Sequence, residues 1–150
     1  MVPGVSGLQA TTRRRGDAVT PGHQKGVIPA SPRLRVFLSL WLPVVVWCGA
    51  IFYLSHIPNL RITQEWWDII ARKIAHMVEF GILARLLVRA LSGSTPWPRK
   101  KIILASLAMA VLYACSDEYH QGFVVGRTAS PMDVLIDASG AWLALRFFRV

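Results

Sequence analysis

Histidine, carboxylate and basic residues gather in three short stretches of this sequence, at 73–79, 117–127 and 133–137. Imidazole and carboxylate groups are ligands that divalent metal ions accept, so these stretches could hold such a cofactor. Carboxylates in apolar surroundings can also act as general acids or bases, and an arginine can grip a phosphate through its planar guanidinium. The candidate catalytic residues are His76, Glu79, Asp117, Glu118, His120 and Asp133; the candidate ligand- and phosphate-binding residues are Lys73, Gln121 and Arg127; the candidate metal ligands are His76, Asp117, His120, Asp133 and Asp137.

Helical spacing places most of these residues on shared faces, because side chains three or four positions apart are neighbours on a helix. One face carries Arg72, His76, Glu79 and Leu83; a second carries Tyr113, Asp117, His120 and Gln121; a third carries Asp133, Asp137, Gly140 and Ala144. Small residues on the third face would let two helices approach closely. Arg85 and Arg89 point away from the first face, and we expect them to reach the membrane surface.

Four apolar segments must position these side chains. The chain is 53% hydrophobic with a net charge of +9, and so short a soluble chain can hardly bury that much apolar surface. The segment 36–55 has no charged residue and is long enough to cross a bilayer. Further transmembrane helices are predicted at 69–91, from 102 through 114 toward a loop at 121–130, and at 131–148, with a short interfacial helix at 62–68.

Basic residues are spread unevenly between these segments. Lysine and arginine are frequent in 1–35, in 92–101 and at the C-terminal end, whereas the loops at 56–68 and 121–130 hold only Arg61 and Arg127. The positive-inside rule therefore places both termini in the cytoplasm and the two sparse loops outside. We predict an all-α, four-transmembrane-helix bundle at 36–150, preceded by a disordered basic arm at 1–35. The polar candidates then lie together at the outer ends of the helices.

The lipid bilayer is the expected partner. Nucleic acid is not expected, since no basic groove or aromatic-interleaved patch accompanies the positive charge. Cys48 and Cys115 lie inside apolar runs without zinc or redox spacing, which indicates small core residues. The sequence indicates no oligomeric state.

Several of these strings together resemble the VanZ-like family. The resemblance is carried by KIAHMVEFGIL at 73–83, SDEYHQ at 116–121, Gly126-Arg127, Asp133 and Gly140, and FYLS at 52–55 is similar to the end of that family's first helix. It covers about residues 36–148; the family often has Pro where Val125 stands and commonly Asn where Asp137 stands. The resemblance implies a bacterial multi-pass protein of the cell membrane, linked to the cell envelope and to resistance against the glycopeptide teicoplanin. It supplies no reaction.

Three functions remain open for the polar cluster. It could catalyse a reaction on an envelope lipid or a lipid-linked glycan, with or without a divalent metal. It could bind or shield such a molecule, or another glycopeptide-related target, without chemistry, with Lys73 and Arg127 facing anionic groups. It could instead be a salt-bridged network that only fixes the bundle, as buried ion pairs often do. For Tyr113, Tyr119 and Gln121 we favour this structural role.

Overall fold

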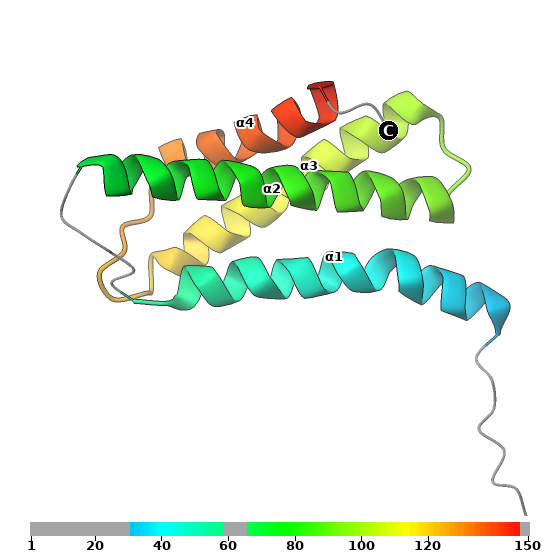
Figure 1. Ribbon diagram of the computed structural model, residues 1–150, viewed down its shortest axis with the longest axis horizontal. Helices are drawn as coiled ribbons and strands as arrows, with labels where there is room; N and C mark the ends of the chain where they lie inside the picture. Colours follow the sequence, from blue (N-terminus) through cyan, green and yellow to red (C-terminus); the bar gives the residue numbers. More distant parts are fainter. Residues whose placement is uncertain (1–30, 59–65, 148–150) are drawn as a thin grey trace, which may run out of the picture.

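The computed structural model describes residues 31–58 and 66–147, which form four α-helices and no strand (Figure 1). The helices are α1, Pro32–His56; α2, Trp66–Ser94; α3, Arg99–Gln121; and α4, Pro131–Phe147. The predicted all-α class with four helices is confirmed. Residues 1–30 of the arm predicted at 1–35, and residues 62–65 of the interfacial segment predicted at 62–68, lie outside the described residues.

The first three helices begin earlier than the sequence predicted. α1 begins at Pro32, inside the predicted arm, because the Ser31 hydroxyl accepts a hydrogen bond from the Leu34 amide at 3.3 Å. Both a serine cap and a proline in the first turn favour a helix start. α2 begins at Trp66 and so includes the end of the segment predicted as a separate interfacial helix. α3 begins at Arg99, within the predicted loop, and its three consecutive basic residues therefore form its first turn.

The helices run alternately up and down, so that the C-terminal ends of α1 and α3 meet the N-terminal ends of α2 and α4 (Figure 1). We call this the polar end. The acidic side chains that the structure describes all lie in the helix halves that form it: Asp68, Glu79, Asp117, Glu118, Asp133 and Asp137. The opposite end, the basic end, carries Arg33, Arg35, Arg89, Arg99, Lys100, Lys101 and Arg146.

α2 is the central helix and packs against the other three (Figure 1). Its Phe80 and Leu83 side chains are almost fully buried, in a cluster with Ile51 of α1, Ala114 of α3 and Ala141 of α4. Among the described residues, α1 contacts α2 and α3 but not α4. The core is therefore a narrow layer around α2, filled partly by alanines that keep the helices close.

Glycines set the distance between α2 and α4 at their crossing. A Cβ atom on Gly140 would lie 2.2 Å from the carbonyl oxygen of Met77, and one on Gly81 would lie 3.3 Å from the Cβ atom of Ala144. The backbone of α4 thus rests directly on the backbone of α2 at Gly140. The prediction that small residues on this face allow close helix approach is confirmed.

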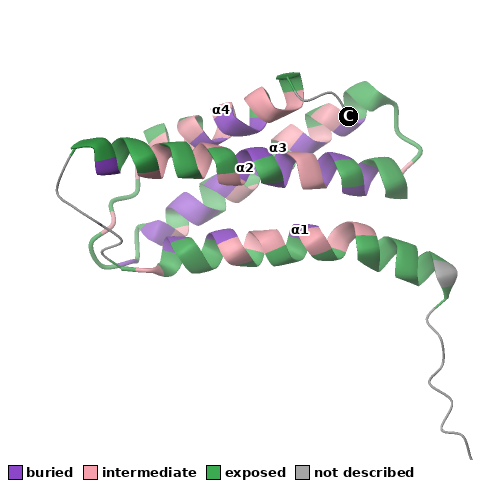
Figure 2. Cartoon of the chain, in the orientation of Figure 1, coloured by how far each residue is buried: buried purple, intermediate pink, exposed green. Residues whose placement is uncertain are grey.

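Two helices, α1 from Arg33 to His56 and α3, are long and apolar enough to cross a membrane, judged by length and composition. Figure 2 shows that α1 in particular leaves much of its surface exposed. Large apolar side chains such as Val45, Val46 and Tyr53 are 61–69% exposed on it. An apolar surface of this extent is unfavourable in water and suits contact with lipid.

Side-chain hydrogen bonds to main-chain oxygens connect α1 to its neighbours. The Trp47 indole on α1 donates to the Glu79 carbonyl of α2 at 2.9 Å. The Tyr113 hydroxyl on α3 donates to the Cys48 carbonyl of α1 at 2.6 Å. In an apolar environment such bonds contribute to helix association, because burial of apolar surface alone gives little preference for protein over lipid.

Candidate functional site

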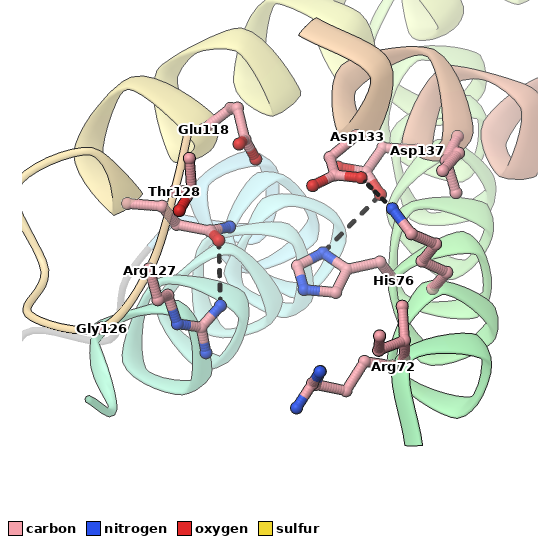
Figure 3. A pocket seen from close by; sticks show the side chains of 12 residues that line it. Arg72, His76, Glu118, Gly126, Arg127, Thr128, Asp133 and Asp137 are labelled. Carbon is pink, nitrogen blue, oxygen red and sulfur yellow. Dashed lines mark hydrogen bonds and ion pairs between the residues drawn. The ribbon is translucent and has the colours of Figure 1, made fainter. Parts of the chain in front are cut away.

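A cavity of about 280 Å³ opens at the polar end, between α2, α4 and the segment that leaves α3 (Figure 3). Its lining is rich in charged side chains. They come from one face of α2, the first two turns of α4, the last turn of α3 and the loop between α3 and α4. The lining residues are Ile69, Arg72, Lys73, His76, Glu118, Gln121, Gly126, Arg127, Thr128, Asp133, Ile136 and Asp137.

The α2 wall of the cavity presents three basic side chains one turn apart or less. Arg72 is paired with Asp68 on its own helix, with 2.7 Å between Nη1 and Oδ2. Lys73 forms an ion pair with Asp133 across the cavity, and both side chains remain partly exposed. His76 lies one turn further along α2 and is half-buried. Of the face predicted on α2, Arg72 and His76 therefore line the cavity.

The α4 wall presents Asp133 and Asp137, one helical turn apart. Asp137 is 1% exposed, and its Oδ1 atom lies 3.6 Å from Nδ1 of His76. That distance is too long for a hydrogen bond. Within the part of the chain that the structure describes, Asp137 Oδ1 has no hydrogen-bond partner. A hydrogen-bond donor on a ligand would contribute most to binding at a buried carboxylate oxygen of this kind.

The loop 122–130 closes the third side of the cavity and is shaped by a left-handed glycine. Gly126 has a φ angle of 81°, a conformation that residues with a side chain rarely adopt. The loop then returns to the bundle through Ser130, whose amide donates to the Glu118 carboxylate at 2.5 Å. Glu118 thereby ties the last turn of α3 to the start of α4.

Arg127 faces the cavity and also holds the end of α1. Its guanidinium donates to the Leu54 carbonyl at 3.0 Å, to the Ile57 carbonyl at 3.4 Å and to Gln121 Oε1 at 2.9 Å. Burial lowers the pKa of this guanidinium from its ordinary value, and the nearby Asp117 opposes the shift. The residue predicted as a phosphate clamp therefore also binds two carbonyls at the end of α1, of which that of Leu54 accepts the Ile57 amide as well, at 3.3 Å.

Asp117 lies beside the cavity rather than in it. Its Oδ2 atom accepts hydrogen bonds from the Ser55 hydroxyl at 2.7 Å and from Gln121 Nε2 at 2.8 Å. Through Gln121 this buried network reaches Arg127. The sequence predicted Asp117 and Gln121 but missed Ser55, because Ser55 was the last residue of an apolar segment and carried no pattern of its own.

His120 and Glu79 do not line the cavity. The Nε2 atom of His120 lies 3.2 Å from Nδ1 of His56, and the ring of Phe52 packs against His120 with centroids 4.3 Å apart. Glu79 is half-buried on α2, and its main-chain oxygen accepts the bond from Trp47. These two candidates therefore lie next to α1, whereas Lys73, His76, Glu118, Gln121, Arg127, Asp133 and Asp137 line the cavity.

The five candidate metal ligands occupy three places. His76, Asp133 and Asp137 line the cavity, Asp117 belongs to the network with Ser55, and His120 pairs with His56. In residues 31–58 and 66–147, no three His, Cys, Asp or Glu side chains form a group that could hold a metal ion.

The sequence matches the model of the VanZ/LLP1 family over residues 30–150. The match covers all four helices and the cavity, and the chain belongs to this family. The resemblance found in the motifs is thus confirmed. Together with the two apolar helices, family membership indicates a membrane protein. No curated protein and no solved structure matches the chain.

Proposed function

We propose that this member of the VanZ/LLP1 family crosses the bacterial cytoplasmic membrane four times and binds the polar headgroup of an envelope lipid or lipid-linked glycan at the outer face. The single observation that carries the proposal is the charged cavity at the polar end. A pocket lined by Arg72, Lys73 and Arg127 among apolar helices is suited to an anionic group at the membrane surface. Binding or masking an envelope component would also connect this family with glycopeptide resistance.

The distribution of charge supports the proposed topology. The basic end holds arginine and lysine on all four helices, and every described acid lies in the other half of the bundle. This is the asymmetry that the positive-inside rule associates with a cytoplasmic face. α2 and α4 are more polar or shorter than α1 and α3, but they cross each other tightly at Gly140 and enclose the cavity. Their costly polar groups thus face the interior of the bundle, as expected for membrane helices that carry a site.

Lipid retention tests the proposed binding. The protein is purified in mild detergent, and the lipids that remain bound are identified and counted by mass spectrometry. Replacing Lys73 with Gln removes a cavity cation, and we expect the retention of phosphate-bearing lipid to fall about tenfold or more, since a charge-assisted hydrogen bond contributes about 1.5–3 kcal/mol. Lys100→Gln at the basic end is the matched control, because it removes the same charge far from the cavity. Equal loss from both variants would contradict the proposal.

Acid–base chemistry on the bound molecule is a second candidate, and the pair of His76 and Asp137 favours it. A buried carboxylate beside Nδ1 of a histidine can orient the ring and stabilise its protonated form, so that Nε2 could serve as a base. Incubation of the purified protein with bacterial lipid extract, followed by mass spectrometry, tests for a product. Catalysis predicts that His76→Asn abolishes product formation while lipid is still retained. If the unsubstituted protein forms no product, simple binding remains.

A further inference from the structure

The cavity has walls of opposite charge. Figure 3 shows the carboxylates of Glu118, Asp133 and Asp137 on one side and the guanidinium groups of Arg72 and Arg127 on the other, with His76 between them. A ligand with negative charge alone would gain from the basic wall and be repelled by the acidic one. A ligand that carries both charges would be complementary to the whole cavity.

Asp137 is the acid on this wall whose Oδ1 atom accepts no hydrogen bond within the described residues; its neighbour is His76, with Nδ1 at 3.6 Å. Asp133 is already paired with Lys73, and Glu118 accepts the Ser130 amide at 2.5 Å. Asp137 Oδ1 is buried, and no hydrogen bond reaches it from any residue that the structure describes. Because an unsatisfied buried acceptor is costly, a donor that enters the cavity would be held there.

A primary ammonium group fits this position. It carries three N–H donors around one positive charge, and so it can bond to a carboxylate and neutralise it. The volume of about 280 Å³ limits what accompanies the ammonium. Pockets for drug-sized ligands begin at roughly 300 Å³, so this cavity accommodates a headgroup and not a whole sugar chain.

We propose that the ligand is zwitterionic, with a primary ammonium group on Asp137 and a phosphate or carboxylate facing Arg72 and Arg127. This inference rests on the proposed function and narrows its ligand class. Two sources carry the same chemistry: the headgroup of an aminated phospholipid, and a free zwitterion such as phosphoethanolamine.

The test compares ligands that differ only in their N–H donors. Detergent-purified full-length protein is titrated with short-chain phosphatidylethanolamine, phosphatidylcholine and phosphatidylglycerol, and binding is measured by native mass spectrometry. Free phosphoethanolamine and phosphocholine form the soluble arm. Choline has no N–H group, so we expect the ethanolamine compound to bind about tenfold or more tightly than the choline compound. Asp137→Asn should reduce this ratio to near one, whereas Ser106→Ala, a buried polar change far from the cavity, should preserve it.

Each outcome separates the two proposals. Preference for ethanolamine in the lipid arm or in the soluble arm supports the inference and identifies the source. Binding of phosphatidylglycerol without preference for ethanolamine overturns the inference and leaves the proposed headgroup site intact. Absence of binding in every arm overturns the inference, and the lipid-retention experiment then decides whether the proposed headgroup site stands. A preference that survives in Asp137→Asn also overturns the inference, provided that thermal melting shows this variant to be folded.

Discussion

At the polar end, the contact between α1 and α3 depends on a few hydrogen-bond donors to the buried carboxylate of Asp117. Ser55 and Gln121 both donate to its Oδ2 atom, and these two bonds join α1 to α3. Its Oδ1 atom has no partner in the described part of the chain. Any further loss of donors would leave most of a buried carboxylate unsatisfied, which costs more than the bond itself contributes.

Replacing Ser55 with Ala should destabilise the protein by about 1–3 kcal/mol, because it removes one of the donors to this buried carboxylate. The measurement is the thermal melting temperature of the purified protein in detergent. Ser116→Ala is the control, since Ser116 is the exposed neighbour of Asp117 on α3. Equal melting temperatures for the two variants would show that the Ser55 bond contributes nothing.

At the same scale, the sequence predicted the members of the cavity better than their orientation. The spacing of three and four residues placed Asp117, His120 and Gln121 on one face, but His120 and Gln121 are adjacent and are therefore rotated by about 100° around the helix. Asp117 and His120 therefore turn toward Ser55 and His56 of α1, whereas Glu118 and Gln121 line the cavity. Which of two adjacent faces meets the neighbouring helix depends on packing, and a single helix does not encode it.

At the scale of elements, the crossing of α2 and α4 fixes the two longest walls of the cavity. His76 precedes Met77, the residue on which Gly140 rests, and Asp137 lies one turn before Gly140. The contact between the two backbones therefore sets how far Asp137 stands from His76. A change in helix separation at this point would directly change the distance between the α2 and α4 walls of the cavity.

Gly140→Ala should destabilise the bundle by about 1–3 kcal/mol or more, since the added methyl group would meet main-chain atoms of Met77 at 2.2–2.7 Å. Gly49→Ala is the matched control: a Cβ atom there has no neighbour within 4 Å, and alanine favours the helix. Denaturation in detergent should therefore show that the stabilities of the two variants shift in opposite directions, or by clearly unequal amounts, from that of the unsubstituted protein. A Gly140→Ala protein as stable as Gly49→Ala would contradict the close crossing.

The end of α1 depends on a loop residue distant in sequence. Arg127→Gln should loosen this end, because the Leu54 and Ile57 carbonyls lose the guanidinium donors that connect them to the loop, and only the Ile57 amide still donates to Leu54. We expect hydrogen exchange in the peptide covering 51–58 to accelerate about tenfold, as a local loss of roughly 1.4 kcal/mol would produce. Arg146→Gln, at the basic end, should leave this peptide unchanged. Unchanged exchange in Arg127→Gln would mean that other contacts hold α1.

At the scale of the whole molecule, the described acids lie at one end of the bundle, and most of the described basic residues lie at the other. The helix count and the positions of the connections were predictable, because apolar length and proline- or glycine-rich loops determine them. The starts of α1 and α3 were not predictable, although that of α4 at Pro131 was: Ser31 and Pro98 allow helices to begin within basic segments that composition assigned to the arm and a loop. The consequence is that basic residues stand on ordered helix ends, close to the proposed cytoplasmic surface.

Cysteine labelling tests the orientation of the bundle. In a background with Cys48 and Cys115 replaced by Ala, Val125→Cys in the α3–α4 loop should react with a membrane-impermeant maleimide on intact cells. Val125 is 78% exposed, so access within the protein does not limit the reaction. Lys100→Cys at the basic end should react only after the membrane is permeabilised. The reverse pattern would place the cavity in the cytoplasm and refute the proposed outer site.

The anchors from Tyr113 and Arg127 have a consequence for how this chain can change during evolution. Both bind main-chain oxygens of α1, and a main-chain oxygen is present whatever side chain the residue carries. Drift among apolar residues on α1, even at Cys48 or Leu54, therefore leaves its attachment intact. Selection should act on the donors instead, so that α1 diverges in sequence among descendants while the tyrosine and arginine that hold it persist.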